Sequence, residues 1–326
     1  MNLVITAPFE PEQLDILKQN HHVEYLPQQE GIPLRTETEL HALLQETQAE
    51  IFICESDKVT QNVLDGLNSL RMICVCRAGL NGIDLAACTK LKIAVTNTAG
   101  RNAGAVADMA VAMFISVARF MSAGERALRE GTWDNDLYYR LRGIELSEHV
   151  AAFIGFGAVP RALAKRLLAF DMELIGYDPF VTAEEMAEHG VRKVDLETAF
   201  REGDFVSNHL PSMPETRGLI DQKLIGLMKP TSYFINTARA ATVCDEDIVE
   251  ALREHRIAGG AFDVFNTEPL PLDSPYLALD NVVLTPHLCG ASLAVVKNHS
   301  RMVTEDIAQF CAGKQPVRLV NKEALS

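Results

Sequence analysis

Three polar side chains in the second half of the chain each follow an apolar stretch of strand type. Arg239 follows the residues YFIN, Glu268 lies in a loop after GGAFDVF, and His287 follows NVVLTP. Because open parallel α/β sheets bind ligands at the carboxyl ends of their strands, these positions are candidates for one site. A guanidinium can hold a carboxylate through two hydrogen bonds. An imidazole can transfer a proton, and a carboxylate can orient the imidazole.

Taken singly, each of these residues has a plainer explanation. An Arg near a helix start or a Glu in a proline-rich loop is more often a solvated surface residue, and a lone His is more often structural. The prediction of a site that binds an organic acid and moves a proton therefore depends on the three residues together.

A glycine-rich turn halfway along the chain predicts a dinucleotide site. The turn contains Gly155 and Gly157, between the apolar run VAAFI and a helical stretch. Backbone N–H groups in such a turn point at a pyrophosphate, and the helix N-terminus adds positive potential. Asp178 ends the next apolar stretch, 178 − 155 = 23 residues later, close to the usual spacing of about 20. Its carboxylate would bind ribose hydroxyls and repel a 2′-phosphate, which favours NAD over NADP.

Proline replaces the third glycine of this pattern, at Pro160. A ring there is bulkier than the usual glycine, but proline suits the first turn of a helix because its missing N–H would be unpaired anyway. We interpret Pro160 as a helix starter; the alternative is a glycine-rich turn that binds nothing. The expected cofactor-binding residues of the turn are Gly155, Phe156, Gly157, Ala158, Val159 and Pro160.

Composition limits the classes of protein to consider. The chain has 326 residues, which suits two domains, with 48% hydrophobic and 23% charged residues. A formal net charge of −14 disfavours nucleic acid and anionic membranes as partners. No run approaches the roughly 18 apolar residues of a membrane helix, and the first residues lack a basic region, so we expect a cytoplasmic protein. Seven cysteines without a CxxC pair indicate reduced thiols, with no metal site.

Apolar strands alternate with amphipathic helices along the whole chain, which predicts parallel sheets covered on both faces. The expected fold class is α/β, with two doubly wound parallel-sheet domains, the first of them discontinuous. We expect a substrate domain formed by residues 1–99 and 293–326 and an NAD-binding domain formed by residues 100–292, with one long helix after NTAGRN. The strands expected first lie at 3–7, 50–55, 71–76 and 93–98, and the second series lies at 150–157, 173–179, 204–211, 232–238, 259–265 and 281–287.

The order GFGxxP, YDP, NTAR, DVFxxEP and TPH strongly resembles the NAD-dependent D-2-hydroxyacid dehydrogenase family, which includes phosphoglycerate dehydrogenases and glyoxylate reductases. The resemblance covers nearly the whole chain and implies Rossmann-like domains and hydride transfer between NAD(H) and a 2-hydroxy or 2-oxo acid. It implies that Arg239 binds the substrate, that His287 is the general acid/base, and that Glu268 holds His287. Departures from the family pattern are Pro160, Ala240 in place of a usual Gly, and a short RAGLNG loop that leaves the substrate open.

The resemblance also implies the remaining site residues. Asp263 resembles the family's contact to the nicotinamide amide, and the backbone of Ala78, Gly79 and Leu80 would bind a substrate carboxylate oxygen. Further expected cofactor-binding residues are His209, Pro211, Thr216, Thr237, Ala238 and Gly290, and further expected substrate-binding residues are Arg77 and Asn102.

Several alternatives stay open at this stage. A related class with this fold binds NAD as a regulatory or corepressor protein, and formate dehydrogenase is a second alternative, against which Glu268 argues. Arg77 would face an anionic part of the substrate or form a structural ion pair. The segment from Trp133 to Arg140 either reaches across a homodimer, the expected assembly, or is a surface loop. Cys289 would be sensitive to oxidation if its thiol were reactive, and inert if buried.

Overall fold

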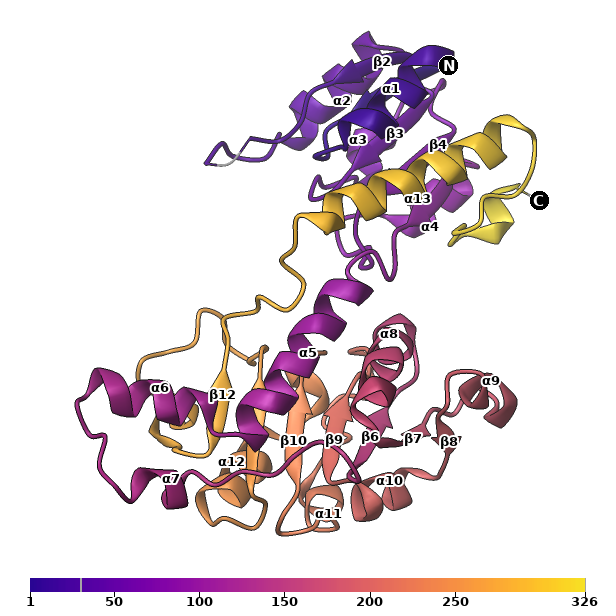
Figure 1. Cartoon of the computed structure of the whole chain (residues 1–326). Coiled ribbons are helices and arrows are strands. Elements are labelled where there is room, and N and C mark those ends of the chain that lie inside the picture. The colour runs from indigo at the N-terminus through magenta and orange to yellow at the C-terminus, as the bar shows by residue number, and fades with distance from the viewer. Residues whose placement is uncertain (30, 326) are drawn as a thin grey trace. The chain divides into compact units, whose positions relative to one another are not determined.

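The expected strands form two separate parallel sheets in the computed structural model, which describes residues 1–29 and 31–325 (Figure 1). The chain divides into two compact units, one formed by residues 1–102 with 292–326 and one by residues 103–291. The predicted α/β class with two doubly wound parallel sheets is confirmed.

The first unit contains a five-stranded sheet in the order β2-β1-β3-β4-β5. Its inner strands are buried on both faces, as in parallel sheets covered by helices. The strands are β1 (Asn2–Ile5), β2 (His22–Tyr25), β3 (Ile51–Cys54), β4 (Met72–Val75) and β5 (Ala94–Asn97). The helices are α1 (Pro11–Asn20), α2 (Glu37–Glu46), α3 (Gln61–Leu64), α4 (Leu85–Lys90) and α13 (Ala294–Cys311), followed by a 3₁₀ turn at Lys322–Leu325.

The second unit contains a seven-stranded sheet in the order β12-β11-β10-β9-β6-β7-β8. The chain leaves β6 toward β7 and β8 and then crosses to β9 on the other side of β6, so the order reverses between β6 and β9. Open α/β sheets bind ligands at such a reversal. The strands are β6 (Val150–Ile154), β7 (Glu173–Tyr177), β8 (Arg192–Lys193), β9 (Phe205–Asn208), β10 (Tyr233–Asn236), β11 (Gly259–Phe262) and β12 (Val282–Leu284).

Helices cover both faces of this sheet, and alternate residues of its strands other than β8 enter two different cores. On one face, Phe205 stacks between Phe114 and Tyr233, with ring centroids 5.0 and 5.2 Å apart. On the other face, Val206 and Phe234 pack against the opposite layer of helices. The helices are α5 (Ala103–Ala118), α6 (Met121–Arg129), α7 (Leu137–Arg140), α8 (Ala158–Leu167), α9 (Ala183–Ala187), α10 (Leu196–Glu202), α11 (Gln222–Ile225) and α12 (Asp245–Arg253), with 3₁₀ turns at Leu168–Phe170, Ala240–Thr242 and Pro275–Ala278.

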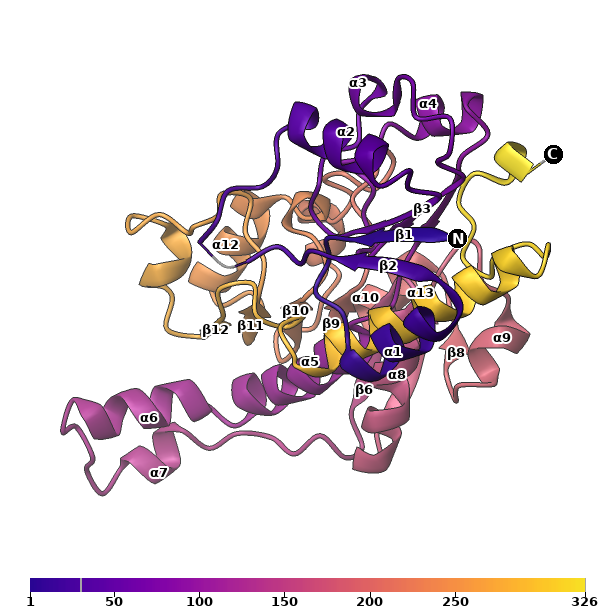
Figure 2. The same cartoon turned by 90° about the horizontal axis from the view of Figure 1, so that it is seen from above.

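The single long helix expected after NTAGRN is wrong, because the chain breaks between α5 and α6. Phe120 takes a left-handed conformation with φ of 52°, which ends the helical run. The returning chain closes the end of α5, since the N–H of Ile144 donates to the carbonyl of Ala118 at 3.1 Å. Figure 2 shows α6 and α7 projecting from the second unit, away from its sheet.

No single helix within residues 1–29 and 31–325 has both the length and the apolar composition to cross a membrane. Only α5 and α6 taken as a pair meet both conditions, and the two are bent by 67° at the break between them.

Candidate active site

The glycine turn joins β6 to α8 and leaves an open surface at the N-terminus of that helix. Gly155 has φ of 92°, and a Cβ on it would lie 3.1 Å from the carbonyl carbon and oxygen of His209. Gly157 is the residue before α8, and a Cβ there would meet no atom within 4 Å. The turn therefore needs glycine at Gly155 for its own backbone, whereas Gly157 leaves free the space where an anion would approach the helix N–H groups.

Pro160 is the third residue of α8 and is buried. Its place in the first turn agrees with our interpretation of it as a helix starter, since no N–H of that turn has a partner within the helix. Ala158 and Val159 are the first two residues of the helix. Arg161, which sequence reasoning missed, lies over the ring of Phe156 at 5.5 Å and donates to the Phe156 carbonyl. Arg161 therefore adds a positive charge beside the turn.

Asp178 directly follows β7 and is hydrogen-bonded to the glycine turn. Its Oδ2 accepts from the N–H of Phe156 and its Oδ1 from the N–H of Phe180, both at 2.8 Å. A carboxylate has about four acceptor sites, so each oxygen keeps capacity for a further donor. The carboxylate thus fits the two hydroxyls of a ribose, which supports NAD(P) binding at this turn.

His209 and Thr216, two of the expected cofactor-binding residues, follow β9, and each forms hydrogen bonds with nearby residues of the chain. The ring of His209 hydrogen-bonds Ser207 at 2.9 Å, and burial lowers the pKa of His209 to about 3, so the ring is neutral at physiological pH. The hydroxyl of Thr216 donates to the carbonyl of Pro211 at 2.5 Å and accepts from the N–H of Met213 at 2.9 Å. Thr216 therefore closes its own loop.

A buried polar network shapes the loop after β10, and sequence reasoning missed it. The amide of Asn208 donates to Asn236 at 3.1 Å and to Thr242 at 2.8 Å. Thr242 in turn donates to the carbonyl of Arg239 at 2.8 Å, and Asn236 accepts from the N–H of Ala238 at 3.1 Å. The feature of the sequence that could have indicated this network is the Asn at the end of each of two apolar strands. This network holds the backbone that presents Arg239.

Thr237 lies inside the same loop, and its hydroxyl is buried with no hydrogen-bond partner among the described residues. Arg239 is exposed, and its guanidinium donates to the carbonyl of Ala238 at 2.6 Å. Within residues 1–29 and 31–325, no carboxylate forms an ion pair with Arg239. The guanidinium thus keeps most of its donors available.

His287 and Glu268 form the hydrogen-bonded pair that the sequence predicts. Nδ1 of His287 lies 2.8 Å from Oε2 of Glu268, and Oε1 of Glu268 accepts from the N–H of Phe265 at 3.0 Å. Burial acts to raise the pKa of Glu268, but the hydrogen bonds from His287 and Phe265, with the charges of His287 and Arg239, outweigh it and lower the pKa overall. Arg239 is therefore near enough to Glu268 to stabilise its ionised form.

Asp263, just beyond β11, organises the loop that carries His287. Its buried carboxylate accepts from the hydroxyl of Thr285 at 2.6 Å and from the N–H groups of Leu288 at 2.7 Å and Cys289 at 2.9 Å. The Cys289 thiol hydrogen-bonds the same carboxylate. Burial and the neighbouring Asp263 raise the pKa of the Cys289 thiol. Gly290 follows and is half-buried.

The expected substrate-binding residues belong to the first unit, and the three catalytic candidates to the second. Nε of Arg77 lies 3.7 Å from Glu55, which also pairs with Arg101 at 2.7 Å. The Arg77 side chain is nevertheless 55% exposed, so the ion pair does not occupy all its donors. Ala78 and Gly79 are exposed, and Leu80 and Asn102 are half-buried.

Within the described residues, no group of three or more His, Cys, Asp or Glu side chains has the arrangement of a metal site.

Comparison with known proteins identifies the family. A family model described as "D-isomer specific 2-hydroxyacid dehydrogenase, NAD binding domain" matches residues 111–289. A Bacillus subtilis protein named "Putative 2-hydroxyacid dehydrogenase YoaD" is 38% identical, over 100% of this chain and 96% of its own length. A glyoxylate reductase of Thermofilum pendens is 36% identical, over 83% of this chain and 80% of its own.

A solved structure agrees with these matches. The apo form of D-mandelate dehydrogenase from Rhodotorula graminis superposes with a TM-score of 0.85 at 25% identity, covering 98% of this chain and 97% of that one. The glycine turn, the Asp178 carboxylate and the matched model all indicate a nicotinamide dinucleotide, NAD(P), as cofactor. The chain belongs to the NAD-dependent D-2-hydroxyacid dehydrogenase family.

Proposed function

We propose that this protein reduces a small 2-oxo acid to the D-2-hydroxy acid, and oxidises it in reverse, with His287 as general acid/base, Glu268 as its partner and Arg239 as the carboxylate ligand. The observation that carries the proposal is the 2.8 Å contact between Nδ1 of His287 and Oε2 of Glu268. An imidazole held by a carboxylate at one nitrogen is the arrangement expected of a proton-transfer group.

The contact also supports one of the two ring nitrogens as the atom that transfers the proton. An ionised carboxylate only accepts hydrogen bonds, so Nδ1 of His287 must carry the donated proton. Nε2 is then the atom that gives a proton to the carbonyl oxygen of the 2-oxo acid during reduction and takes it back during oxidation. Glu268 orients the imidazole through this hydrogen bond, and its second oxygen is held by the N–H of Phe265.

Arg239 provides the electrostatic part of the proposal. Its guanidinium has no carboxylate partner within the described residues and can donate two parallel hydrogen bonds to the substrate carboxylate. The same charge stabilises negative charge on the carbonyl oxygen until Nε2 of His287 protonates it.

The residues after β6 and β7 fit the cofactor. Bound NADH supplies the hydride that the carbonyl carbon accepts. The N-terminus of α8 at Gly157 would hold the pyrophosphate, Arg161 would add a positive charge beside it, and Asp178 would accept from the ribose hydroxyls. We assign NAD in preference to NADP, because the ionised Asp178 would repel a 2′-phosphate.

Oxidation of NADH against a panel of 2-oxo acids tests the proposal, with glyoxylate, hydroxypyruvate and phosphohydroxypyruvate in the panel and NADPH in parallel. Two named relatives direct this choice, the glyoxylate reductase above and an Archaeoglobus fulgidus D-3-phosphoglycerate dehydrogenase that is 31% identical over 58% of its own length. We expect turnover with NADH preferred, and a loss of at least about 100-fold in kcat for His287→Ala. Unchanged turnover in that variant would refute the assignment.

Asp178→Asn tests the cofactor preference separately. The amide keeps one oxygen for the glycine turn but removes the charge that repels a 2′-phosphate. We expect kcat/KM for NADPH to rise and that for NADH to fall. The matched variant Asp195→Asn changes an Asp elsewhere on the same unit, at the N-cap of α10, and is expected to leave the preference unchanged.

A regulatory protein that binds NAD without turnover, the alternative left open by the sequence, is favoured by none of the contacts above. Stoichiometric NAD binding with no activity on any 2-oxo acid would support it. The cytoplasmic location expected from the sequence stays a prediction.

We also propose that the chain forms a homodimer through α6 and α7. Trp133, Tyr138 and Tyr139 are 76, 74 and 66% exposed, and these residue types are enriched at interfaces. Light scattering after size exclusion is expected to give twice the mass of one chain, and Trp133→Glu with Tyr138→Glu is expected to give monomers. A monomeric parent protein would contradict this assembly.

A further inference from the structure

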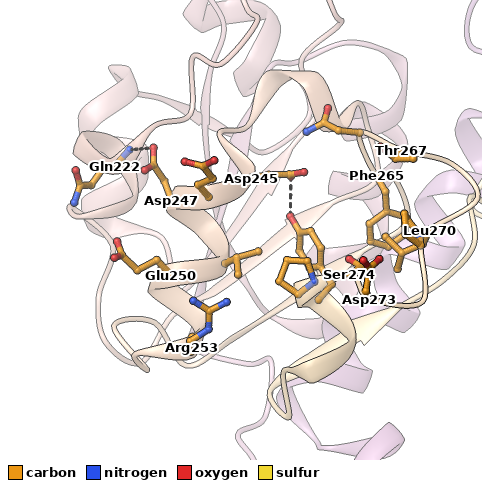
Figure 3. Close-up of a pocket in the computed structure, with 16 residues that line it drawn as sticks. Gln222, Asp245, Asp247, Glu250, Arg253, Phe265, Thr267, Leu270, Asp273 and Ser274 are labelled. Carbon is orange, nitrogen blue, oxygen red and sulfur yellow. Dashed lines mark hydrogen bonds between the residues drawn. The ribbon is translucent and has the colours of Figure 1, made fainter.

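An open groove of about 750 Å³ lies beside the loop that carries Glu268, wholly within the second unit (Figure 3). One wall is α12, with Asp245 and Asp247, and the other is the chain after β11, with Phe265, Thr267 and Leu270. This volume lies in the usual range for small-molecule sites of about 300–1,000 Å³. Neither the glycine turn nor His287 lines the groove, so it is separate from the site proposed above.

The lining of the groove is partly apolar and held in place. The rings of Phe265 and Tyr276 meet edge to face, with centroids 5.5 Å apart, and Leu270 lies beside them in the lining. The Tyr276 hydroxyl donates to Oδ1 of Asp245 at 2.9 Å, which ties one wall to the other. The groove therefore offers a preformed apolar surface.

The rim of the groove carries an excess of negative charge from both walls. Asp247 accepts from the N–H of Gln222 at 2.9 Å, and Glu250 pairs with Arg256 at 2.7 Å. Glu246 and Asp273 are exposed, and their side chains form no hydrogen bond or ion pair within residues 1–29 and 31–325. The lining groups that carry charge are the five carboxylates of Asp245, Glu246, Asp247, Glu250 and Asp273 and the guanidinium of Arg253.

The helix dipole explains only part of this charge. Acidic residues in the first turn of α12 stabilise the positive end of the helix. Asp273 comes from the opposite wall and lies outside α12, so the helix dipole does not account for its negative charge. Carboxylates that face one groove from two elements, around an apolar surface, complement a ligand that is both cationic and apolar.

We propose that this groove binds a small organic cation with an apolar body, and that its occupancy shifts Glu268. The groove-lining residues Thr267 and Leu270 lie on either side of Glu268 in the chain. The N–H of a third, Phe265, donates to Oε1 of Glu268 at 3.0 Å. A ligand in the groove therefore contacts residues that are bonded or adjacent to the carboxylate that holds His287. The consequence for turnover rests on the proposed function, but neither test below measures turnover.

Calorimetric titration of the full chain with phenethylammonium tests the binding step, with phenethyl alcohol and phenylacetate as neutral and anionic counterparts. We expect the cation to bind most tightly. Glu246→Lys with Asp273→Lys is expected to weaken the cation's affinity about tenfold. The matched variant Asp280→Lys, at an exposed position outside the lining, is expected to leave it unchanged. Equal binding of phenylacetate, no binding of the cation, or no loss in the double variant overturns the proposal.

Nuclear magnetic resonance of ¹⁵N-histidine-labelled protein tests the coupling step. The His287 ring signals are assigned from their absence in His287→Gln. We expect phenethylammonium to shift these signals in the parent protein with the affinity found by calorimetry, and to shift them in the double Lys variant only at about tenfold higher concentrations. Unshifted His287 signals in the saturated parent protein would overturn the coupling, whatever the protein does with 2-oxo acids.

Discussion

Asp263 and His287 are joined through the backbone of the loop that follows β12. The carbonyl of Asp263 accepts from the N–H of His287 at 2.9 Å, while its carboxylate accepts from the N–H groups of Leu288 and Cys289. His287 takes a left-handed conformation, with φ of 54°. The residue expected to contact the nicotinamide amide therefore also holds the proposed acid/base in an unfavourable backbone conformation.

Asp263→Asn should disturb this loop, because an amide nitrogen in place of one carboxylate oxygen would face a backbone N–H. One buried donor is then left without an acceptor, at a cost of about 1–3 kcal/mol. We expect the free energy of unfolding in urea to fall by about this amount and kcat to fall with it. Asp280→Asn, on an exposed side chain, serves as the control. Parent-like stability and kcat in the Asp263 variant would contradict the positioning role.

Gly155 and Gly157 offer a matched pair that separates folding from cofactor binding. At Gly155, φ of 92° and the nearby His209 carbonyl exclude a side chain, so Gly155→Ala should cost about 1–3 kcal/mol of unfolding free energy. At Gly157 a Cβ meets nothing within 4 Å and φ is −83°, so Gly157→Ala should leave stability within about 0.5 kcal/mol.

The cofactor affinity of the second variant is the decisive measurement. The Cβ of Gly157→Ala would take space that the proposed pyrophosphate occupies, so we expect the Kd for NADH to rise at least about tenfold. Fluorescence titration with NADH measures this Kd without any substrate. A stable Gly157→Ala protein that binds NADH like the parent would place the pyrophosphate elsewhere.

Glu268 gives a pH dependence of stability with a definite sign. Its folded-state pKa is lowered from the ordinary value of 4.5, so the folded protein binds fewer protons there than the unfolded chain. The stabilisation from Glu268 is therefore present above pH 4.5 and is lost as pH falls through the lower folded-state pKa.

Urea titrations from pH 6 to pH 3 measure this contribution. Because Glu268→Gln does not titrate, its unfolding free energy should fall less steeply with decreasing pH than that of the parent protein. Glu246→Gln should keep the parent slope, because the Glu246 side chain has no hydrogen-bond or ion-pair partner among the described residues. Identical slopes for Glu268→Gln and the parent protein would show that the His287 contact does not favour the ionised carboxylate in solution.

Much of the fold was predictable because buried parallel strands leave a strong apolar signal. The edge strands β2 and β8 were absent from the predicted set, since His22–Tyr25 is polar and only partly buried and Arg192–Lys193 has just two residues. The break at Phe120 was also missed. An apolar pattern continues across it, and the bond from Ile144 that closes α5 comes from a residue far along the chain.

The pairing of His287 with Glu268 was predicted because both residues follow apolar strands and because the family resemblance implies it; in the structure those strands, β11 and β12, are neighbours in the sheet. The supporting contacts were less accessible to sequence reasoning. The network of Asn208, Asn236 and Thr242 depends on which strands lie side by side, and the carboxylate of Asp263 is occupied by a loop that begins after the next strand. From the sequence alone, a short polar residue at the end of a strand does not show which residue it contacts.

Cys289 lies two residues beyond His287, and the structure favours the inert alternative for its thiol. The residue is 1% exposed, and burial together with Asp263 raises the pKa of the thiol. Since the thiolate is the reactive form, we expect iodoacetamide at pH 7.5 to leave Cys289 unmodified in the native protein and to modify it in urea. Mass spectrometry of digested protein reads both states, and the exposed Cys311 is the internal control. Native Cys289 reacting as fast as Cys311 would mean that the loop opens readily and exposes the thiol beside the proposed acid/base.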